Sequence, residues 1–457
     1  FKLSKMIGTV LQDADGQFVG LTVGEDIAFA LENDNVPTAE MHSRVKKVAQ
    51  MVEMHNLLTS SPYELSGGQK QRTSLAGVMI DDVEILLFDE PLANLDPATG
   101  KTAIEIIDDI HQKSLKTVVI IEHRLEDVLH KSIDRVIVIN DGRIVADMSV
   151  HELVSSTVLS ENGIREPLYI TALKYAGVNI TSDMQPGYIT TLQTEFSRKA
   201  LTTWYNAIPS DTRRNDNPSI LKVEHVFFSY DGTRKILDDI TFDICEGEMI
   251  SIVGRNGAGK STLVKHAIGL LKPTNGRVLV EGNDTKNMSV AQIAHTLGFV
   301  FQSPTHMLYA PTVREELEFG PKNLEFEEVE IKKLVAASVS TVNLKNFEEY
   351  PPLGLSFGQQ KRTTIAAVLA MQSKIMIMDE PTAGQDYSNY THFMDAMCRP
   401  VNGSKSLVAA NFAATLFITH DLDLAVTYAN RILLFGDKHI VADGRPEDVL
   451  KDFDLLT

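Results

Sequence analysis

The chemically most informative stretch of the chain is an eight-residue loop rich in glycine. It reads Gly254-Arg255-Asn256-Gly257-Ala258-Gly259-Lys260-Ser261 and fits the spacing G-x-x-x-x-G-K-[ST]. An apolar run at 249–253 precedes it, and a helix-compatible run starting at Thr262 follows it. Glycines let backbone N–H groups approach phosphate oxygens, and the start of a helix adds a positive dipole end. The loop predicts a nucleotide site in which Lys260 contacts the β- and γ-phosphates and Ser261 ligates Mg²⁺.

Two apolar runs, 375–380 and 85–90, end in the pair Asp-Glu. Polar residues at the carboxyl ends of buried parallel strands lie at the sheet edge where phosphate loops also lie. We expect Asp379 to hold Mg²⁺, usually through water, and Glu380 to polarise the attacking water as general base. Glu90 is the first-half equivalent of Glu380.

The elements that position these residues occur twice along the chain. Three features recur at an offset of 290 residues: Gln12 with Gln302, Leu65-Ser66-Gly67-Gly68-Gln69 with Leu355-Ser356-Phe357-Gly358-Gln359, and Asp89 with Asp379. His123 and His420, each after an apolar run, are 297 residues apart. About seven extra residues therefore belong in the second copy, and the stretch 400–406 has loop composition. Repetition at fixed spacing indicates a duplicated domain.

The repeat also defines the expected domains. We expect a first domain at 1–155, a linker at 156–218 and a second domain at 219–457. Within the linker, 163–178 has helical character and the remainder is polar. Trp204, the single tryptophan, is expected to be a local packing anchor there.

The composition limits the class of protein. A length of 457 residues suits two or three domains of ~150 residues. The formal net charge of −18 argues against a protein that binds nucleic acid through its phosphates. Two cysteines exclude a disulfide framework and most zinc or iron–sulfur sites, and they suit a reducing cytosol. No apolar run reaches the ~18–20 residues that span a bilayer, so we expect a soluble chain that reaches a membrane only through partners.

The joint order of these motifs resembles that of ATP-binding-cassette (ABC) ATPases. Residues 65–69 resemble the signature motif of the family, and 355–359 are a variant of it with Phe357 in place of a glycine. The resemblance covers nearly the whole chain except the linker. It implies an α/β fold with two ABC, or P-loop NTPase, domains, each a mixed β core with an inserted helical subdomain.

The resemblance also implies roles for single residues. Gln12 and Gln302 match the Q-loop glutamine, Asp96 and Asp386 the D-loop aspartate, His123 and His420 the switch histidine, and Tyr230 the aromatic residue that stacks on adenine. The implied cofactors are ATP and Mg²⁺, with Ser261, Gln302 and Asp379 as metal ligands. The implied catalytic residues are Glu380, His420 and Gln302, with Glu90 and His123 as first-half counterparts.

Cassettes of this family pair head to tail, so the nucleotide loop of one faces the signature of the other. The complete site is therefore expected to be closed in trans by Ser66-Gly67-Gly68-Gln69 and Asp96. For the other site, positions 290 residues before Lys260 and Tyr230 fall before residue 1. We interpret the chain as N-terminally truncated, favouring a fragment over a truncated gene or a natural half-site.

That incomplete site would use the signature that carries Phe357, which is either a tolerated variant or a weakening substitution. We hypothesise unequal sites, of which the one containing Lys260 and Glu380 hydrolyses ATP.

The segment 12–33 indicates the biological task of the chain. It resembles the Q-loop region of the A components of energy-coupling-factor importers, which take up vitamins and metal ions. Phe18, Val19, Ile27 and Phe29 suit a groove for a coupling helix, although ordinary core accounts for at least half of them. Because the segment after Gln302 departs from this pattern, the two grooves are expected to receive different helices.

The resemblance implies an ATP-hydrolysing, energy-coupling subunit on the cytoplasmic face of the cell membrane. Its expected partners are transmembrane transporter subunits and a small membrane substrate-binding component, and it is expected to bind no nucleic acid. One alternative is a fused ATPase of a sugar-type importer. Another is a soluble tandem cassette acting on ribosomes or DNA, which is disfavoured because the segment 151–219 holds six basic and seven acidic residues.

Overall fold

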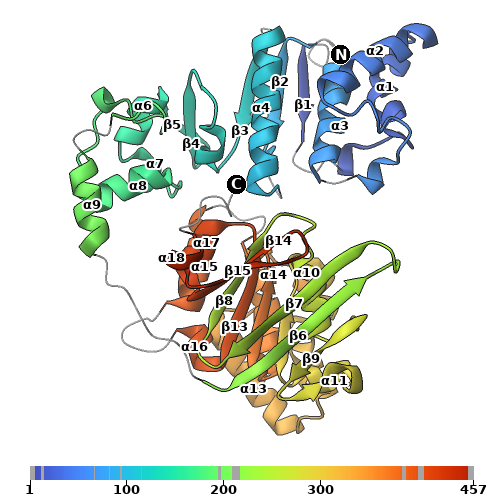
Figure 1. Cartoon of the computed structure of the whole chain (residues 1–457), viewed down its shortest axis with the longest axis vertical. Coiled ribbons are helices and arrows are strands. Elements are labelled where there is room, and N and C mark those ends of the chain that lie inside the picture. Colours follow the sequence, from blue (N-terminus) through green and yellow to red (C-terminus); the bar gives the residue numbers. More distant parts are fainter. Residues whose placement is uncertain are drawn as a thin grey trace. The chain divides into compact units, whose positions relative to one another are not determined.

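The computed structural model of the chain describes residues 6–11, 15–65, 67–81, 83–92, 95–114, 116–193, 197–207, 217–382, 387–399 and 406–450 (Figure 1). Gln12, Ser66, Asp386 and most of the expected insertion at 400–406 lie outside these residues. The chain divides into two compact units, Phe1–Asp211 with Asp386–Ser388, and Thr212–Gln385 with Asn389–Thr457. We call them unit 1 and unit 2.

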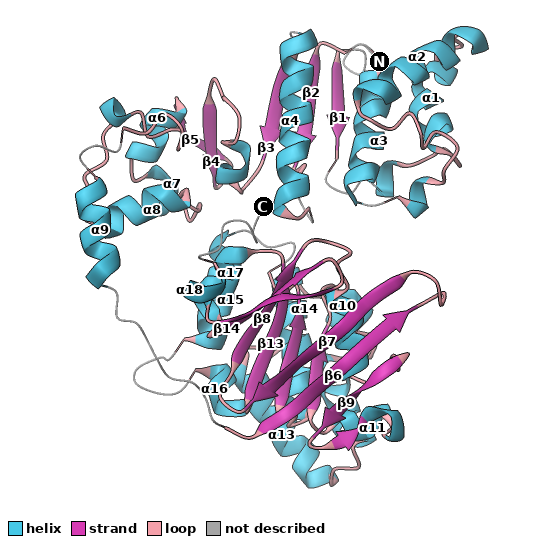
Figure 2. Cartoon of the chain, in the orientation of Figure 1, coloured by secondary structure: helices cyan, strands magenta, loops and turns pink. Residues whose placement is uncertain are grey.

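Unit 2 is built on two sheets. Its strands are β6 (Ser219–Ser229), β7 (Lys235–Cys245), β8 (Met249–Gly254), β9 (Asn275–Val280), β10 (Asn283–Asp284), β11 (Leu297–Val300), β12 (Ile375–Asp379), β13 (Ala414–Thr419), β14 (Arg431–Gly436) and β15 (His439–Gly444). The six-stranded sheet has the order β11-β12-β13-β8-β14-β15, parallel except for β15. An antiparallel sheet of order β10-β9-β6-β7 packs with it (Figure 2).

The helices of unit 2 are α10 (Lys260–Ala267), α11 (Val290–Ala294), α12 (Val313–Asn323), α13 (Glu328–Thr341), α14 (Phe357–Ala370), α15 (Tyr387–Cys398), α16 (Leu407–Asn411), α17 (Leu422–Tyr428) and α18 (Pro446–Val449). One core lies between the two sheets and α10, and a second joins α12, α13 and α14 to the other face of the main sheet. Apolar residues fill both faces of β12 and β13, as expected for central parallel strands.

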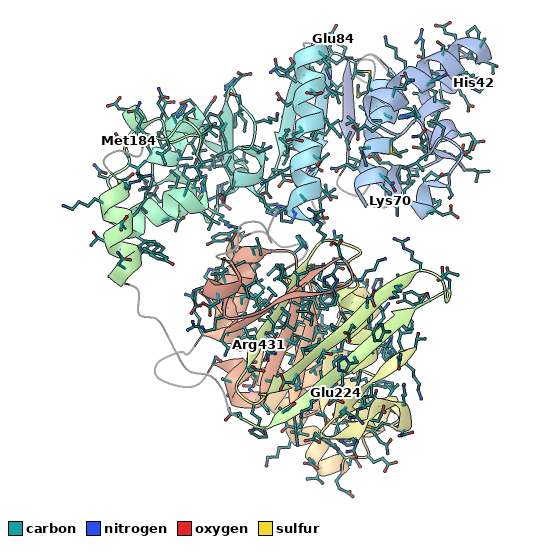
Figure 3. All side chains as sticks on the ribbon, in the orientation of Figure 1. His42, Lys70, Glu84, Met184, Glu224 and Arg431 are labelled. Atoms are coloured by element: carbon teal, nitrogen blue, oxygen red, sulfur yellow. The ribbon has the colours of Figure 1, made fainter. Side chains whose placement is uncertain are left out.

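Polar contacts fix the rims of these sheets. Arg431 lies at the start of β14 (Figure 3). It contacts Glu248 Oε1 at 3.0 Å and Asp443 Oδ1 at 2.7 Å, and its side chain is only 19% exposed. On the antiparallel sheet, Arg277 Nε donates to Glu224 Oε2 at 2.6 Å. A largely buried arginine satisfied by two carboxylates ties β14, β15 and the turn before β8 together.

Unit 1 repeats part of this plan. Its strands are β1 (Ile7–Val10), β2 (Ile85–Asp89), β3 (Thr117–Ile121), β4 (Val136–Asn140) and β5 (Arg143–Met148). Its helices are α1 (Val23–Asn33), α2 (Thr38–Met51), α3 (Gly67–Met79), α4 (Pro97–Ser114), α5 (Leu125–Val128), α6 (Val150–Ser155), α7 (Val158–Glu161), α8 (Leu168–Tyr175) and α9 (Arg198–Ala207). β1, β2 and β3 form a parallel sheet, and β4 and β5 form a hairpin.

Strand registers confirm the internal repeat. Ile7 pairs with Ile85 in unit 1, and Leu297 pairs with Ile375 in unit 2, so both partners are shifted by 290 residues. Ile85 pairs with Thr117, whereas Ile375 pairs with Ala414, a shift of 297 for the third strand. The seven-residue slip expected from the histidines is therefore present between these strands. Both units have an α/β architecture with helices inserted between the first two of these strands.

The units differ at the centre of the main sheet. In unit 2, β13 and β14 both pair with β8. In the described part of unit 1, β3 pairs only with β2 and β4 only with β5, so the counterpart strands do not share a neighbour. Ile121 on β3 and Ile139 on β4 are 57% and 65% exposed, whereas the whole of β13 is buried.

Most of the described expected linker is folded rather than extended. Leu159, Ile170 and Leu173 of the expected linker share one buried cluster with Leu153 of α6 and Val138 of β4. Farther along, the ring of Trp204 on α9 stacks on that of Tyr175 with centroids 6.2 Å apart. The helical character expected at 163–178 is present as α8, and Trp204 packs locally as expected.

No helix among the described residues is long and apolar enough to cross a membrane.

A glycine repeated in both units brings a strand against the helix that begins at the signature motif. A Cβ on Gly298 of β11 would lie 2.3 Å from Val368 Cγ1 of α14, and one on Gly8 of β1 would lie 2.2 Å from Val78 Cγ1 of α3. These are the same positions at the 290-residue offset. Close strand-to-helix packing thus sets where α14 and α3 sit against their sheets.

We expect Gly298→Ala to destabilise unit 2 by about 1–3 kcal/mol, because the added methyl overpacks a filled contact. Differential scanning calorimetry without nucleotide measures the change. Gly358→Ala on α14 is the matched control: its Cβ would meet nothing within 4 Å, so it is expected to be neutral or stabilising by up to ~1 kcal/mol. An unchanged melting temperature for Gly298→Ala would contradict the packing argument.

Candidate nucleotide-binding site

The glycine-rich loop of unit 2 leaves the carboxyl end of the central strand β8. A Cβ on Gly254 would lie 2.3 Å from the carbonyl oxygen of Phe435, so only glycine fits between the strands. Gly259 has φ +108°, a left-handed conformation that side chains rarely adopt. The loop then enters α10, whose first N–H groups have no partner within the helix. This strand, loop and helix are the arrangement expected for a phosphate cradle.

Lys260 is held inside that loop. Its Nζ donates to the carbonyl oxygens of Gly254 at 2.6 Å and Arg255 at 3.0 Å, and the side chain is buried. These contacts curl the lysine over the loop, where a phosphate would meet both the ammonium and the backbone N–H groups.

Ser261 and Asp379 come together from different elements. Ser261 lies in the first turn of α10 and Asp379 ends β12, and the two side chains are joined by a hydrogen bond. Burial raises the pKa of Asp379 above its ordinary value, and the Ser261 hydroxyl and the Lys260 charge oppose that shift. The sequence predicted these two as metal ligands, and a hydroxyl beside a carboxylate is an oxygen donor set that suits Mg²⁺.

Glu380 and His420 form the second pair at this sheet edge. His420 Nδ1 lies 3.0 Å from Glu380 Oε1, and the two side chains are 17% and 10% exposed. Glu380 has φ +44°, and its N–H donates to the carbonyl oxygen of Ile418 at 2.9 Å. The adjacent strand therefore fixes the backbone from which the carboxylate projects.

Lys361 is the member of this cluster that the sequence reasoning missed. It lies on α14, is 1% exposed, and its Nζ donates to the carbonyl oxygen of Glu380 at 3.3 Å. The available signal was the 290-residue offset, which aligns Lys361 with Gln71 and so marks a charged residue where the first half has a neutral one.

Tyr230 lies at the rim of the loop rather than in the strand core. It follows β6, its side chain is 59% exposed, and its hydroxyl is 3.3 Å from Thr262 Oγ1. Phe228 supports the ring edge-on, with centroids 4.8 Å apart. The exposed ring is thus available for stacking on a base. Gln302, just after β11, is also exposed.

The described residues of unit 1 that are predicted to close the site lie at the beginnings of two helices. Gly67, Gly68 and Gln69 begin α3. Asp96 accepts hydrogen bonds from the N–H and hydroxyl of Thr99, at 3.1 and 2.9 Å, and so caps the start of α4.

The first-half acid and histidine lie farther apart than their counterparts. His123 Nδ1 is 3.8 Å from Glu90 Oε1, and the side chains are 34% and 32% exposed. Glu122, next to this histidine, accepts hydrogen bonds from the N–H groups of Leu92, His123 and Arg124, and burial raises its pKa. The head-to-tail closure of a site by unit 1 stays a prediction.

Comparison with known proteins follows the same division. The model of the ABC transporter family matches residues 2–93 and 237–383. A second model, described as ATP-binding cassette cobalt transporter, matches residues 156–228.

Relatives match the chain over nearly its whole length. An ABC transporter ATP-binding protein of Photobacterium profundum is 45% identical over 453 residues, which is 99% of this chain and 79% of that protein. One from Enterococcus faecalis is 45% identical over 457 residues, or 100% of this chain and 79% of the relative. Among solved structures, cbiO1 of Clostridium perfringens, part of the ABC transporter complex cbiONQ, is 31% identical and covers 52% of this chain and 93% of its own, with a TM-score of 0.46.

The phosphate loop, the paired acids and the repeated strand registers are thus accompanied by a family match in both halves and by relatives that span the chain. This protein belongs to the ABC transporter family, as an ATP-binding ATPase with two cassettes.

Proposed function

We propose that this ATPase is the energy-coupling subunit of a membrane importer of the energy-coupling-factor type, with a vitamin or a metal ion as cargo. The observation that carries the proposal is the match of residues 156–228, outside the first cassette, to a family described as a cobalt transporter. It agrees with the resemblance of segment 12–33 to the A components of such importers. Its place would be the cytoplasmic face of the membrane, with transmembrane subunits and a small substrate-binding membrane protein as partners.

In the proposed site, ATP lies with its phosphates on the loop at 254–261 and its adenine on Tyr230. Lys260 and the first N–H groups of α10 then face the β- and γ-phosphates, which concentrates positive charge where negative charge develops during hydrolysis. Closure by residues 66–69 and Asp96 of the first cassette would complete the donors around the γ-phosphate.

A magnesium ion would be held by Ser261 and Asp379, with Gln302 as the third protein ligand in the proposal. The bonded hydroxyl and carboxylate of Ser261 and Asp379 fit such an ion. When bound, Mg²⁺ neutralises charge on the β- and γ-phosphate oxygens.

Hydrolysis is assigned to Glu380 and His420. The Glu380 carboxylate would accept a proton as a water oxygen attacks the γ-phosphorus and the bond to the ADP oxygen breaks, giving ADP and phosphate. His420, 3.0 Å from Glu380 Oε1, fixes the direction of that carboxylate. Loss of the γ-phosphate would then shift the cassettes from a closed toward an open arrangement, which moves the membrane subunits.

The grooves for the membrane subunits are proposed beside α1 and α12. In both units a carboxylate on that helix accepts hydrogen bonds from the loop that precedes the helix. Asp26 Oδ1 accepts from the N–H groups of Val19 and Gly20 at 2.8 and 3.1 Å. At the 290-residue offset, Glu316 Oε2 accepts from those of Tyr309 and Ala310, both at 2.8 Å. The two loops thus share the same hydrogen bonds to the backbone but carry different side chains.

Exposure separates groove residues from core in these segments. Phe18 and Ile27, two of the four residues considered for the groove, are core, with exposures of 8% and 0%. Val19 and Phe29 are exposed, and their counterparts Tyr309 and Phe319 are exposed as well and pack edge-on with centroids 4.9 Å apart. The two grooves share a phenylalanine but differ at the other position, where Val19 in unit 1 corresponds to Tyr309 in unit 2, which supports two different coupling helices.

We expect Glu380→Gln to lower the ATP turnover number by at least ~100-fold, because a glutamine cannot accept the proton of the attacking water. Glu90→Gln, its matched control in the first half, is expected to spare turnover. Steady-state phosphate release measures both. Equal losses in the two variants would contradict unequal sites.

We expect Tyr230→Ala to raise the Kd for ATP by about 10-fold, since stacking of a base on an aromatic ring contributes about 1–3 kcal/mol. Tyr205→Ala on α9 removes a tyrosine with the same 59% exposure away from the loop and is expected to leave the Kd unchanged. Isothermal titration calorimetry gives both constants. A Tyr230→Ala protein that binds ATP as tightly as the parent would remove this residue from the site.

Tyr309→Glu is expected to reduce recovery of the transmembrane subunit when the protein is affinity-purified from detergent-solubilised membranes, because an unpaired carboxylate is costly at an apolar contact. Val329→Glu on α13, where valine is 83% exposed, is the control and should retain the partner.

The parent purification also tests the assignment as a whole. Recovery of a transmembrane subunit with a small membrane substrate-binding protein supports the proposed importer. Recovery of a sugar importer, or of ribosomes without membrane protein, contradicts it.

A further inference from the structure

A lysine buried beside Glu380 has no assigned role in the site. Lys361 is 1% exposed, and burial lowers its pKa to about 8, while the negative charge of Glu380 acts in the opposite direction. Its Nζ donates to the Glu380 carbonyl oxygen at 3.3 Å. A fully buried ammonium is costly unless it has partners, so packing alone is a poor reason for a lysine here.

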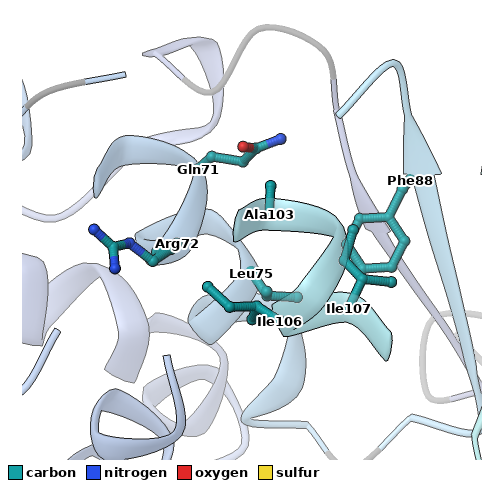
Figure 4. A pocket seen from close by; sticks show the side chains of 7 residues that line it. All are labelled: Gln71, Arg72, Leu75, Phe88, Ala103, Ile106 and Ile107. Atoms are coloured by element: carbon teal, nitrogen blue, oxygen red, sulfur yellow. The ribbon is translucent and has the colours of Figure 1, made fainter. Parts of the chain in front are cut away.

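The surroundings of this position differ between the two halves of the chain. At the 290-residue offset its counterpart is Gln71, whose Nε2 donates to the carbonyl oxygen of Pro91, one residue beyond Glu90. An open apolar hollow lies beside Gln71, walled by Leu75, Phe88 and Ala103 among others (Figure 4). The counterpart of Ala103 is Phe393, which packs into the core of unit 2. In unit 2 a phenylalanine thus fills the position at which unit 1 has an alanine beside this hollow.

The distance and the exposure of the acid–histidine pair also differ between the two units. In unit 2 the Glu380–His420 distance is 3.0 Å and the side chains are 10% and 17% exposed. In unit 1 the Glu90–His123 distance is 3.8 Å, with 32% and 34% exposure. Both glutamates have a left-handed φ, +44° and +46°, so backbone conformation alone does not make the difference.

The backbone contacts show how Lys361 would act. The N–H of Glu380 is fixed by Ile418 on β13, and its C=O by Lys361 on α14. A non-glycine residue at positive φ is strained and persists only where neighbours over-determine it. Fixing both sides of the residue restricts the rotation of its backbone, and so limits where the carboxylate can point.

We propose that Lys361 is a positioning residue that holds Glu380 in the orientation in which its carboxylate meets His420 and the attacking water. The proposal deepens, and rests on, the assignment of Glu380 as general base.

The beginning of the same helix supports this assignment. The ring centroid of Phe357 lies 5.7 Å from Lys361 Nζ, a cation–π contact one helical turn away. In the first half these two positions are Gly67 and Gln71, so the aromatic ring and the lysine replace glycine and glutamine together. Phe357 thus supplies a partner for the ammonium, and the helix that starts at the signature becomes linked to Glu380.

The test measures steady-state ATP turnover and the equilibrium Kd for ATP in variants of the full chain. Lys361→Met keeps the side-chain length without a donor, and we expect kcat to fall about 10- to 100-fold with the Kd unchanged, since a misplaced catalytic group costs this much. Lys361→Gln, the first-half residue, retains a donor and is expected to restore part of kcat. Lys332→Met removes an exposed lysine on α13 that pairs with Glu328 and should keep the parent kcat.

The single variants Glu380→Gln and Lys361→Met separate this proposal from the assignment on which it rests. If Glu380→Gln alone retains turnover, the proposed general base is wrong whatever Lys361 does. If Glu380→Gln removes turnover and Lys361→Met keeps the parent kcat, the positioning role is overturned.

When both changes are combined, Lys361→Met should cause no further loss beyond Glu380→Gln. A further loss as large as in the parent would show that Lys361 acts independently of Glu380, and would overturn the proposal. A Lys361→Met protein that melts earlier and binds ATP more weakly would also overturn it, in favour of a purely structural role; Lys361→Gln provides the same comparison if the methionine variant does not fold.

Discussion

The burial of charged groups at the carboxyl edge of one parallel sheet is the constraint on which the rest of unit 2 depends. Lys260, Asp379, Glu380 and Lys361 are all largely buried, and a buried charge persists only with a partner. Each has one: loop carbonyls for Lys260, a hydroxyl for Asp379, an imidazole for Glu380, and a backbone carbonyl for Lys361. The partners come from four separate elements, so the site exists only when the sheet and its helices are assembled.

The central position of β8 explains why these elements converge. β8 is flanked by β13 and β14, which places the phosphate loop beside the strand ends that carry His420 and, one strand farther, Asp379 and Glu380. Unit 1 has corresponding outer strands and an equivalent acid and histidine. There β3 and β4 share no described neighbour, and the acid–histidine pair is longer and more exposed. The duplication has therefore produced two related units with different local chemistry.

The two halves stabilise an equivalent loop by the same hydrogen bonds, although the loops expose different side chains. Asp26 and Glu316 hold equivalent loops through two backbone N–H groups each, yet the side chains displayed are Val19 in one and Tyr309 in the other. A carboxylate that accepts from the backbone fixes a loop without reference to the side chains that the loop carries. Duplicated domains of this kind can diverge at their contact surfaces while their frameworks stay alike.

The sequence by itself determined the repeat, the α/β class, the phosphate loop and the acids at the strand ends, because these depend on local spacing and on strand or helix periodicity. The registers confirm the offsets of 290 and 297 residues that the motifs predicted. Only the tertiary structure decided which residues are buried together. Phe18 and Ile27 became core while Val19 and Phe29 stayed exposed, and much of the expected linker joined the core around β4. Lys361 is 19 residues from Glu380 along the chain, and its contact with that residue depends on the packing of α14 against the sheet, which no local pattern specifies.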